Sequence, residues 1–164
     1  MAKTIRSAKT RDSATSLTQS NTCPECGAPS TPELNCQSAF DNCLVMEFTN
    51  ADFGAVHHLT VATYMLQHSS KLSLEGWLSM RGLLREFLVE NKSPLEVRRT
   101  NRSLVDSGKR TWKFSSPDGL PKIGQVRWTM TILDVRMEPA ELYCADINKW
   151  AAAVLADAML VDTD

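Results

Sequence analysis

Residues 56–68 read V-H-H-L-T-V-A-T-Y-M-L-Q-H, and this stretch organises the predicted fold. Four of its residues fall at positions i, i+4, i+7 and i+11 and therefore share one face of a helix: His57, Val61, Tyr64 and His68. We expect this helix to run from about Asp52, a suitable N-cap, to His68 or just beyond. All three histidines of the chain lie in it, so this helix carries every imidazole that the chain can offer.

A short cysteine motif, C-P-E-C-G at residues 23–27, lies upstream of this helix. Two cysteines separated by two residues can both reach one tetrahedral zinc ion, and the glycine permits the tight turn that directs backbone N–H groups at the sulfurs. A redox C-x-x-C motif would open a helix, whereas Pro29 and Pro32 follow here and break any helix. A loop with two idle thiols is the remaining interpretation, because C-x-x-C alone is half of a zinc signature. We predict a zinc knuckle.

The next two cysteines differ in their expected surroundings. Apolar residues recur at helical spacing over about residues 38–49, which predicts a helix capped by Ser38 or Asn35. Cys36 precedes this helix and is free to point at the knuckle, whereas Cys43 lies in the apolar stripe and is expected in the core. Even if the helix began earlier, the two residues would lie about 10 Å apart along its axis. Sulfurs that bind one zinc at about 2.3 Å each lie much closer together, so Cys36 is the predicted third ligand.

The fourth ligand has to be chosen among the histidines. His57 and His68 share a face but lie about 16 Å apart along the helix axis, so one metal ion cannot bind both. His58 is rotated by about 100° from that face and is expected to be solvated. His68, near the end of the helix, can interact with the terminal carbonyl groups there. We predict His57 as the fourth ligand, and the choice between His57 and His68 stays open.

These motifs together resemble an uncharacterised family of small bacterial proteins. The resemblance is carried by C-P-x-C-G, by a cysteine before an aromatic-bearing helix, and by V-H-x-L-T-V-x-x-Y-x-x-Q-H. W-x-M-T-x-x-D-V at Trp128–Val135 and W-A at residues 150–151 look similar too, so the likeness spans about residues 23–159. In the family the final histidine is usually followed by proline, and here Ser69 follows. The resemblance implies no activity, and it implies these functional positions: Cys23, Cys26, Cys36, His57 and His68.

Composition limits the broad class of protein. The chain has 164 residues and a net charge of −1, which suits one domain and argues against a wholesale nucleic-acid binder. Its five cysteines, four of them within residues 23–43, fit a reducing compartment better than a disulfide framework. No run approaches the roughly 18 apolar residues of a membrane span, so we expect a cytoplasmic protein with no membrane association. Residues 1–22 are expected to form a disordered basic tail, although a transit peptide shares this composition, and residues 23–164 a single domain.

The rest of the chain is predicted to be mostly helical. Amphipathic patterns predict helices over about residues 73–90, 93–108 and 139–160. Ser93-Pro94-Leu95-Glu96 is the signature of a capping box at the second of these helices. Residues 126–132 alternate between apolar and polar, and with residues 112–114 they could form a small β-hairpin.

A basic segment lies between Glu96 and Lys113. Its positive side chains include Arg98, Arg99, Arg102, Lys109 and Arg110. The simpler interpretation is a solvated helix face. The functional alternative is a nucleic-acid contact through phosphates, with Trp112 and Phe114 available for stacking on bases.

The predicted architecture is a mainly α bundle of about five helices with a small β-hairpin and an N-terminal zinc-knuckle loop. The predicted zinc ligands are Cys23, Cys26, Cys36 and His57. Two functions stay open: a non-enzymatic module with structural zinc and an unknown protein partner, or a metal-dependent hydrolase that uses the Cys/His site and Glu47 as general base. A closed site with three cysteines and one histidine favours the module, because catalytic zinc generally leaves a position for water.

Overall fold

The computed structural model describes residues 21–106, 113–115 and 126–161, and helices dominate this part of the chain. The α-helices in order are α1 (Cys36–Thr49), α2 (Ala51–Gly54), α3 (His57–Gln67), α4 (Leu74–Leu88), α5 (Pro94–Asp106) and α6 (Ala140–Met159), and a 3-10 turn, η1 (Ile132–Asp134), precedes α6. Among the described residues no helix is long and apolar enough to cross a membrane. The predicted tail lies outside the described residues except for Asn21 and Thr22.

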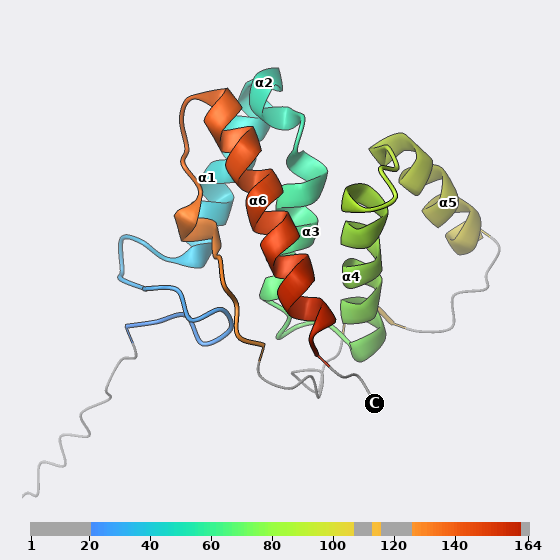
Figure 1. Cartoon of the computed structure of the whole chain (residues 1–164), viewed down its shortest axis with the longest axis horizontal. Helices are drawn as coiled ribbons and strands as arrows, with labels where there is room; N and C mark the ends of the chain where they lie inside the picture. Colours follow the sequence, from blue (N-terminus) through green and yellow to red (C-terminus); the bar gives the residue numbers. More distant parts are fainter. Residues whose placement is uncertain (1–20, 107–112, 116–125, 162–164) are drawn as a thin grey trace, which may run out of the picture.

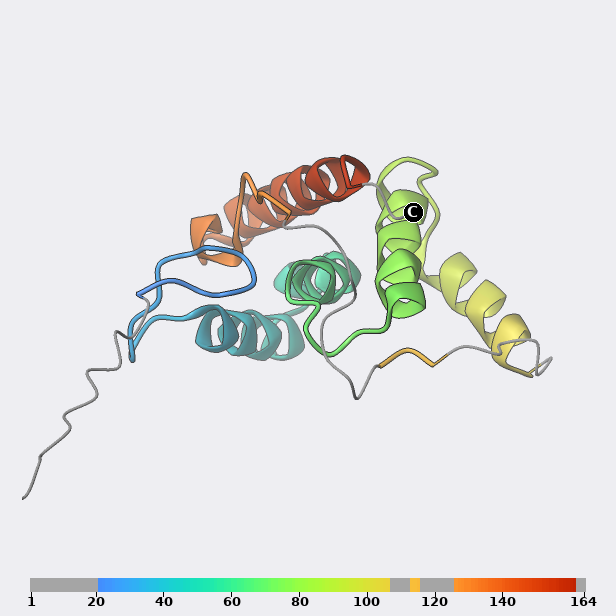
Figure 2. The same cartoon turned by 90° about the horizontal axis from the view of Figure 1, so that it is seen from below.

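Helix α3 lies at the centre of the bundle (Figures 1 and 2). Figure 2 shows it nearly end-on, with α1 on one side, α6 on the opposite side and α4 beside it, while α5 lies against α4 on the outside. The core side chains with less than 1% exposure include Leu66 of α3, Trp77 and Leu84 of α4, and Tyr143, Ile147, Trp150 and Val154 of α6. The organising role that the sequence predicted for this helix therefore corresponds to its central place in the fold.

The buried side of α3 also carries polar side chains that are hydrogen bonded across the core. Gln67 Nε2 donates to the Met130 carbonyl at 2.8 Å, and Trp150 Nε1 donates to Gln67 Oε1 at 3.2 Å. Buried amides are tolerated when both ends are paired in this way. Gln67 therefore fixes α6 and the segment around Met130 to the same turn of α3.

The helix starts follow their capping residues. Asn35 caps α1, where its side chain accepts from the Ser38 N–H at 2.9 Å and Ser38 Oγ accepts from the Asn35 N–H at 3.1 Å. Ser93 and Glu96 form the predicted box at α5, where Glu96 Oε2 accepts from the Ser93 N–H at 2.8 Å. Because these contacts are local, the sequence is enough to predict them.

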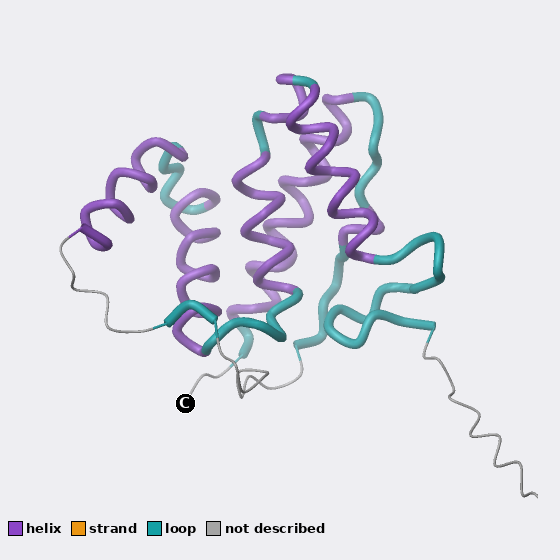
Figure 3. Tube along the Cα trace, turned by 180° about the vertical axis from the view of Figure 1, so that it is seen from behind, coloured by secondary structure: helices purple, strands orange, loops and turns teal. Residues whose placement is uncertain are grey.

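The predicted β-hairpin is not supported. The described residues contain no strand, as Figure 3 shows, and Trp112 lies outside them. The backbone around Thr129 is instead paired with side chains: the Thr129 N–H donates to Asp157 Oδ2 at 2.7 Å, and the Met130 carbonyl accepts from Gln67. Alternation of apolar and polar residues fits an extended segment of either kind, so it did not distinguish a strand from a chain that lies along helices.

The basic residues on α5 are exposed. Arg98, Arg99 and Arg102 all lie on its solvent-accessible surface, whereas Lys109 and Arg110 lie outside the described residues. Phe114, which we considered for base stacking, is half-buried and packs against the core. Of the basic residues named in the nucleic-acid hypothesis, the described part of the chain therefore contains the three exposed arginines of α5.

Candidate metal centre

The knuckle is a tight turn with a left-handed glycine. Gly27 has φ +76°, a conformation that costs glycine little because it has no Cβ. Its N–H donates to the Cys23 carbonyl at 2.9 Å, and the Cys23 N–H donates to the Ala28 carbonyl at 2.7 Å. These bonds close the loop and hold the two cysteines of the motif on one side of it, as the C-P-E-C-G pattern predicted.

Four potential metal ligands meet where this loop contacts α1 and α3. Their ligand atoms all lie within 4.8 Å of one another, and the residues are Cys23, Cys26, Cys36 and His68. Four ligands around one zinc, with Zn–S bonds of about 2.3 Å, lie about 3.8 Å from one another in a tetrahedron. Cys26 and Cys36 are buried, and Cys23 and His68 are half-buried. The group therefore has the number and type of ligands of a tetrahedral site, and its distances are compatible with one.

The imidazole of His68 is oriented by a hydrogen bond on its other nitrogen. Its Nδ1 lies 3.1 Å from the Tyr64 carbonyl, which can only accept, so Nδ1 carries the proton. Nε2 then holds the lone pair, and this buried nitrogen has no hydrogen-bond partner among the described residues. A histidine ligand with its second nitrogen on a backbone carbonyl is the usual arrangement in metal sites. The unpartnered Nε2 beside three sulfurs is thus the feature that a bound metal ion explains.

The thiols of the group influence one another's ionisation. The Cys26 and Cys36 sulfurs lie 3.3 Å apart. A hydrogen bond from Cys36, together with the nearby His68 ring, holds the pKa of Cys26 well below its ordinary value despite burial. The same contact with Cys26, followed by burial, raises the pKa of Cys36. The centre therefore favours one thiolate stabilised by a neighbouring thiol, and a thiolate is the form that binds metal.

An aromatic stack supports the histidine side of the group. The Phe40 ring of α1 stacks on Tyr64 of α3 with centroids 3.9 Å apart, and Tyr64 stacks on the His68 ring at 4.2 Å. Burial raises the pKa of Tyr64. The stack restricts rotation of the His68 ring and connects the N-terminal half of α1 to the C-terminal end of α3.

Glu25, inside the knuckle, fixes the chain that follows His68. Its carboxylate accepts from the Ser70 N–H at 2.7 Å and from the Ser70 hydroxyl at 3.1 Å. Its backbone carbonyl accepts from Trp128 Nε1 at 3.1 Å. We did not predict these roles of Glu25 and Trp128, because their partners are remote in sequence and no local pattern marks them.

His57, which we predicted as the fourth ligand, is not brought to this group. It lies at the opposite end of α3 from His68, about 16 Å away along the helix axis. The reason is that α1 and α3 pack antiparallel, with Phe40 against Tyr64 and Glu47 against His57. The start of α1, where Cys36 lies, is therefore next to the end of α3. Helical periodicity placed His57 and His68 on one face of α3, but it does not indicate which end of α3 the knuckle contacts.

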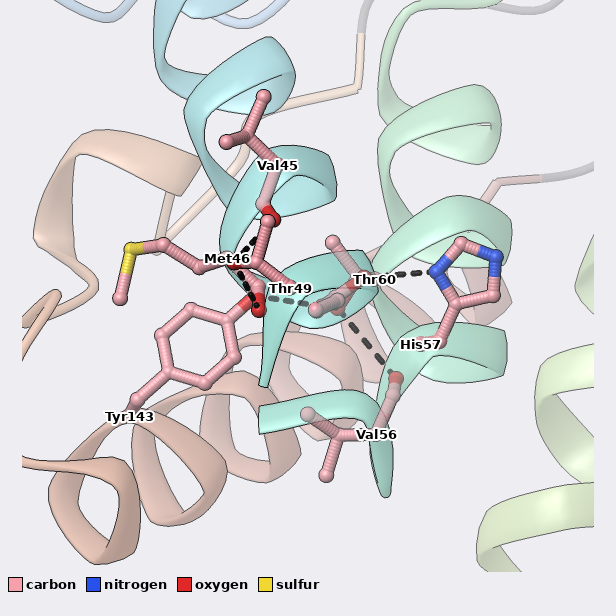
Figure 4. Close-up of polar contacts among 8 residues, drawn as sticks. Val45, Met46, Thr49, Val56, His57, Thr60 and Tyr143 are labelled. Carbon is pink, nitrogen blue, oxygen red and sulfur yellow. Dashed lines mark hydrogen bonds and ion pairs between the residues drawn. The ribbon is translucent and has the colours of Figure 1, made fainter. Parts of the chain in front are cut away.

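His57 instead belongs to a hydrogen-bonded cluster around the buried carboxylate of Glu47. Figure 4 labels the three side chains that surround this carboxylate, His57, Thr60 and Tyr143. Its Nδ1 lies 2.7 Å from Glu47 Oε2, while Thr60 of α3 and Tyr143 of α6 both donate to Glu47 Oε1 at 2.5 Å. The Glu47 side chain is 1% exposed. Glu47, the predicted general base of the hydrolase alternative, thus lies near the far end of α1 from Cys36 and serves to hold three helices together.

The remaining cysteines and His58 lie elsewhere. Cys43 is fully buried in the core, as predicted, and burial raises its pKa. Cys144 is half-buried and lies 3.4 Å from the Asp52 carbonyl. His58 is half-buried rather than solvated, with its ring edge against Phe87, and burial lowers its pKa. In the described part of the chain, none of these three belongs to the group of four ligands.

Comparison with known proteins identifies the family. No curated protein and no solved structure matches this chain. A family model matches residues 21–159, which include the knuckle, α1 to α6 and all four candidate ligands. The resemblance to an uncharacterised family is thereby confirmed. The chain belongs to DUF5946, a family of unknown function.

Proposed function

We propose that this chain is a zinc-binding helical module in which one structural Zn²⁺ is held by Cys23, Cys26, Cys36 and His68. The observation that carries the proposal is the group of four ligand atoms within 4.8 Å of one another, with the His68 Nε2 unpartnered. Three thiolates and one imidazole are a soft ligand set that suits zinc, whereas magnesium and calcium prefer oxygen ligands.

The role of the ion is structural, because four protein ligands complete its tetrahedron. A catalytic zinc site keeps one position for water or substrate. The base that we considered for a hydrolase, Glu47, is also occupied by His57, Thr60 and Tyr143. We therefore favour a non-enzymatic binding or regulatory protein over a metal-dependent hydrolase.

Zinc binding supplies the stability that the knuckle lacks by itself. Outside its two buried residues, Cys26 and Ala28, the loop of residues 21–35 is mostly exposed. Such a loop buries little apolar surface to offset the entropy of ordering it. A shared ion would join this loop to the start of α1 and the end of α3, so that metal binding and local folding become one equilibrium.

The test pairs each proposed ligand with a similar residue elsewhere. We expect purified protein, prepared without chelator, to contain about one zinc per chain by elemental analysis. Cys36→Ser should lose the zinc, whereas Cys43→Ser, on the same helix, should retain it. His68→Ala should lose the zinc, whereas His57→Ala should retain it and lose stability through Glu47 instead.

Stability and metal content have to be measured on the same samples. A chelator that removes zinc should lower the melting temperature of the wild type and leave that of Cys36→Ser unchanged. Protein without stoichiometric zinc would contradict the proposal. Loss of zinc from His57→Ala with retention in His68→Ala would show that the ligand set is wrong.

A further inference from the structure

A cavity of about 600 Å³ lies between α3, α4 and α5, away from the metal centre. Its volume falls within the roughly 300–1,000 Å³ range of sites for small molecules. Helix α3 contributes Val61 and Met65 to its lining, and α4 contributes Met80, Leu83 and Phe87. The walls formed by these two helices are therefore mostly hydrocarbon.

The third wall is different in chemistry. Helix α5 contributes Arg98, Asn101 and Arg102 beside the apolar Val97. Arg98 forms no ion pair or hydrogen bond with any described residue. A guanidinium group at the edge of an apolar cavity offers several N–H donors to an anion, and it binds carboxylates with two parallel hydrogen bonds. The cavity therefore combines an apolar interior with a cationic edge.

We propose that this cavity binds an amphipathic carboxylic acid of the medium-chain fatty acid class. The carboxylate pairs with Arg98, and the hydrocarbon chain lies against α3 and α4. A nucleotide or a sugar phosphate fits less well, because its many polar groups would face methionine and phenylalanine side chains and lose their hydrogen bonds to water. This inference does not depend on the zinc proposal, since the cavity and the metal centre share no residue.

The histidines give a direct readout for this binding. The chain has three histidines. His57 and His58 line the cavity, and His68 belongs to the metal centre. Titration of the full chain with decanoate, followed by NMR of the imidazole C–H signals, should shift the His57 and His58 signals and leave the His68 signal in place.

Two neighbouring arginines provide the matched variants. Arg98→Gln should weaken decanoate binding about tenfold or more, because it removes a charge-assisted contact. Arg99→Gln, on the same helix but outside the cavity lining, should bind decanoate as the wild type does. Decanol, which has the same chain length without the charge, should bind the wild type about tenfold more weakly than decanoate.

Specific results would overturn the proposal. An anion such as decanoate also binds non-specific basic surfaces, and equal losses of affinity in Arg98→Gln and Arg99→Gln would indicate that kind of contact. Equal affinity for decanol and decanoate would leave Arg98 without a role. Absence of shifts at His57 and His58 in a chain with native helical circular dichroism would show that the cavity does not take this class of ligand.

Discussion

Tyr143→Phe tests the cluster that joins α1, α3 and α6. The Tyr143 side chain is fully buried, and its hydroxyl donates to Glu47 Oε1. Burial and then the contact with Glu47 raise the pKa of Tyr143, so the hydroxyl keeps its proton and remains a donor. Phenylalanine preserves the ring and its packing on Phe53, which lies 5.2 Å away between centroids. The substitution therefore removes one hydrogen bond and creates almost no cavity.

The expected cost follows from the acceptor. A hydrogen bond to a charged group contributes about 1.5–3 kcal/mol. After the change, the donors that the Glu47 carboxylate keeps among the described residues are Thr60 and His57. We expect the free energy of unfolding to fall by about 1.5–3 kcal/mol in urea, with an unchanged dependence on denaturant concentration. The matched control is Tyr64→Phe, because the Tyr64 hydroxyl donates at 3.2 Å to the exposed Gln37.

The stability change in Tyr64→Phe is the value against which Tyr143→Phe is judged. Tyr64→Phe should change the free energy of unfolding by no more than about 0.5 kcal/mol, as is usual for surface changes. Both variants and the wild type have to be compared with equal zinc content. If Tyr143→Phe proved as stable as the wild type, or matched Tyr64→Phe, the Glu47 cluster would not be the connection between helices that we infer.

Two further predictions concern carboxylates. The Arg136 guanidinium, which bonds to Asp146 at 2.6 and 2.8 Å, holds the pKa of that carboxyl below its ordinary value. A carboxyl of this kind stabilises the fold fully above its unfolded pKa of about 3.9 and loses that effect as the pH falls toward its lower folded-state pKa. The melting temperatures of the wild type and Asp146→Asn should therefore approach each other gradually as the pH falls below about 4. A constant difference between them would contradict this. The second prediction concerns Glu25→Gln, which weakens the contact with Ser70 beside the metal centre. Zinc transfer from this variant to a coloured chelator should be several-fold faster than from the wild type. Glu33 is an exposed acid of the same loop, and Glu33→Gln should leave the transfer rate unchanged.

Much of the local structure could be predicted because its causes are local. The Asn35 cap, the Ser93 and Glu96 box, and the apolar face of α6 all depend on residues a few positions apart. The position of Cys36 beside the knuckle could be predicted for the same kind of reason. Its distance from Cys43 along the helix meant that one of the two cysteines at most could lie next to the knuckle sulfurs.

The parts that could not be predicted depend on contacts between remote segments. His68, and not His57, lies beside the three cysteines because α1 and α3 pack antiparallel, and periodicity does not report that packing. In the described residues 126–132, Gln67 and Asp157 bond the backbone of Met130 and Thr129 from two different helices, where a strand was predicted. The Glu25 contact with Ser70 bridges 45 positions, so no local pattern marks it.

X-ray absorption spectroscopy at the zinc edge tests the central claim most directly. We predict that the zinc-loaded wild type shows three sulfur ligands at about 2.3 Å and one nitrogen ligand at about 2.0–2.1 Å. His68→Cys should convert this spectrum to four sulfur ligands, whereas His57→Cys should leave it unchanged. A wild-type spectrum with an oxygen ligand, or with two nitrogen ligands, would contradict the closed site formed by Cys23, Cys26, Cys36 and His68.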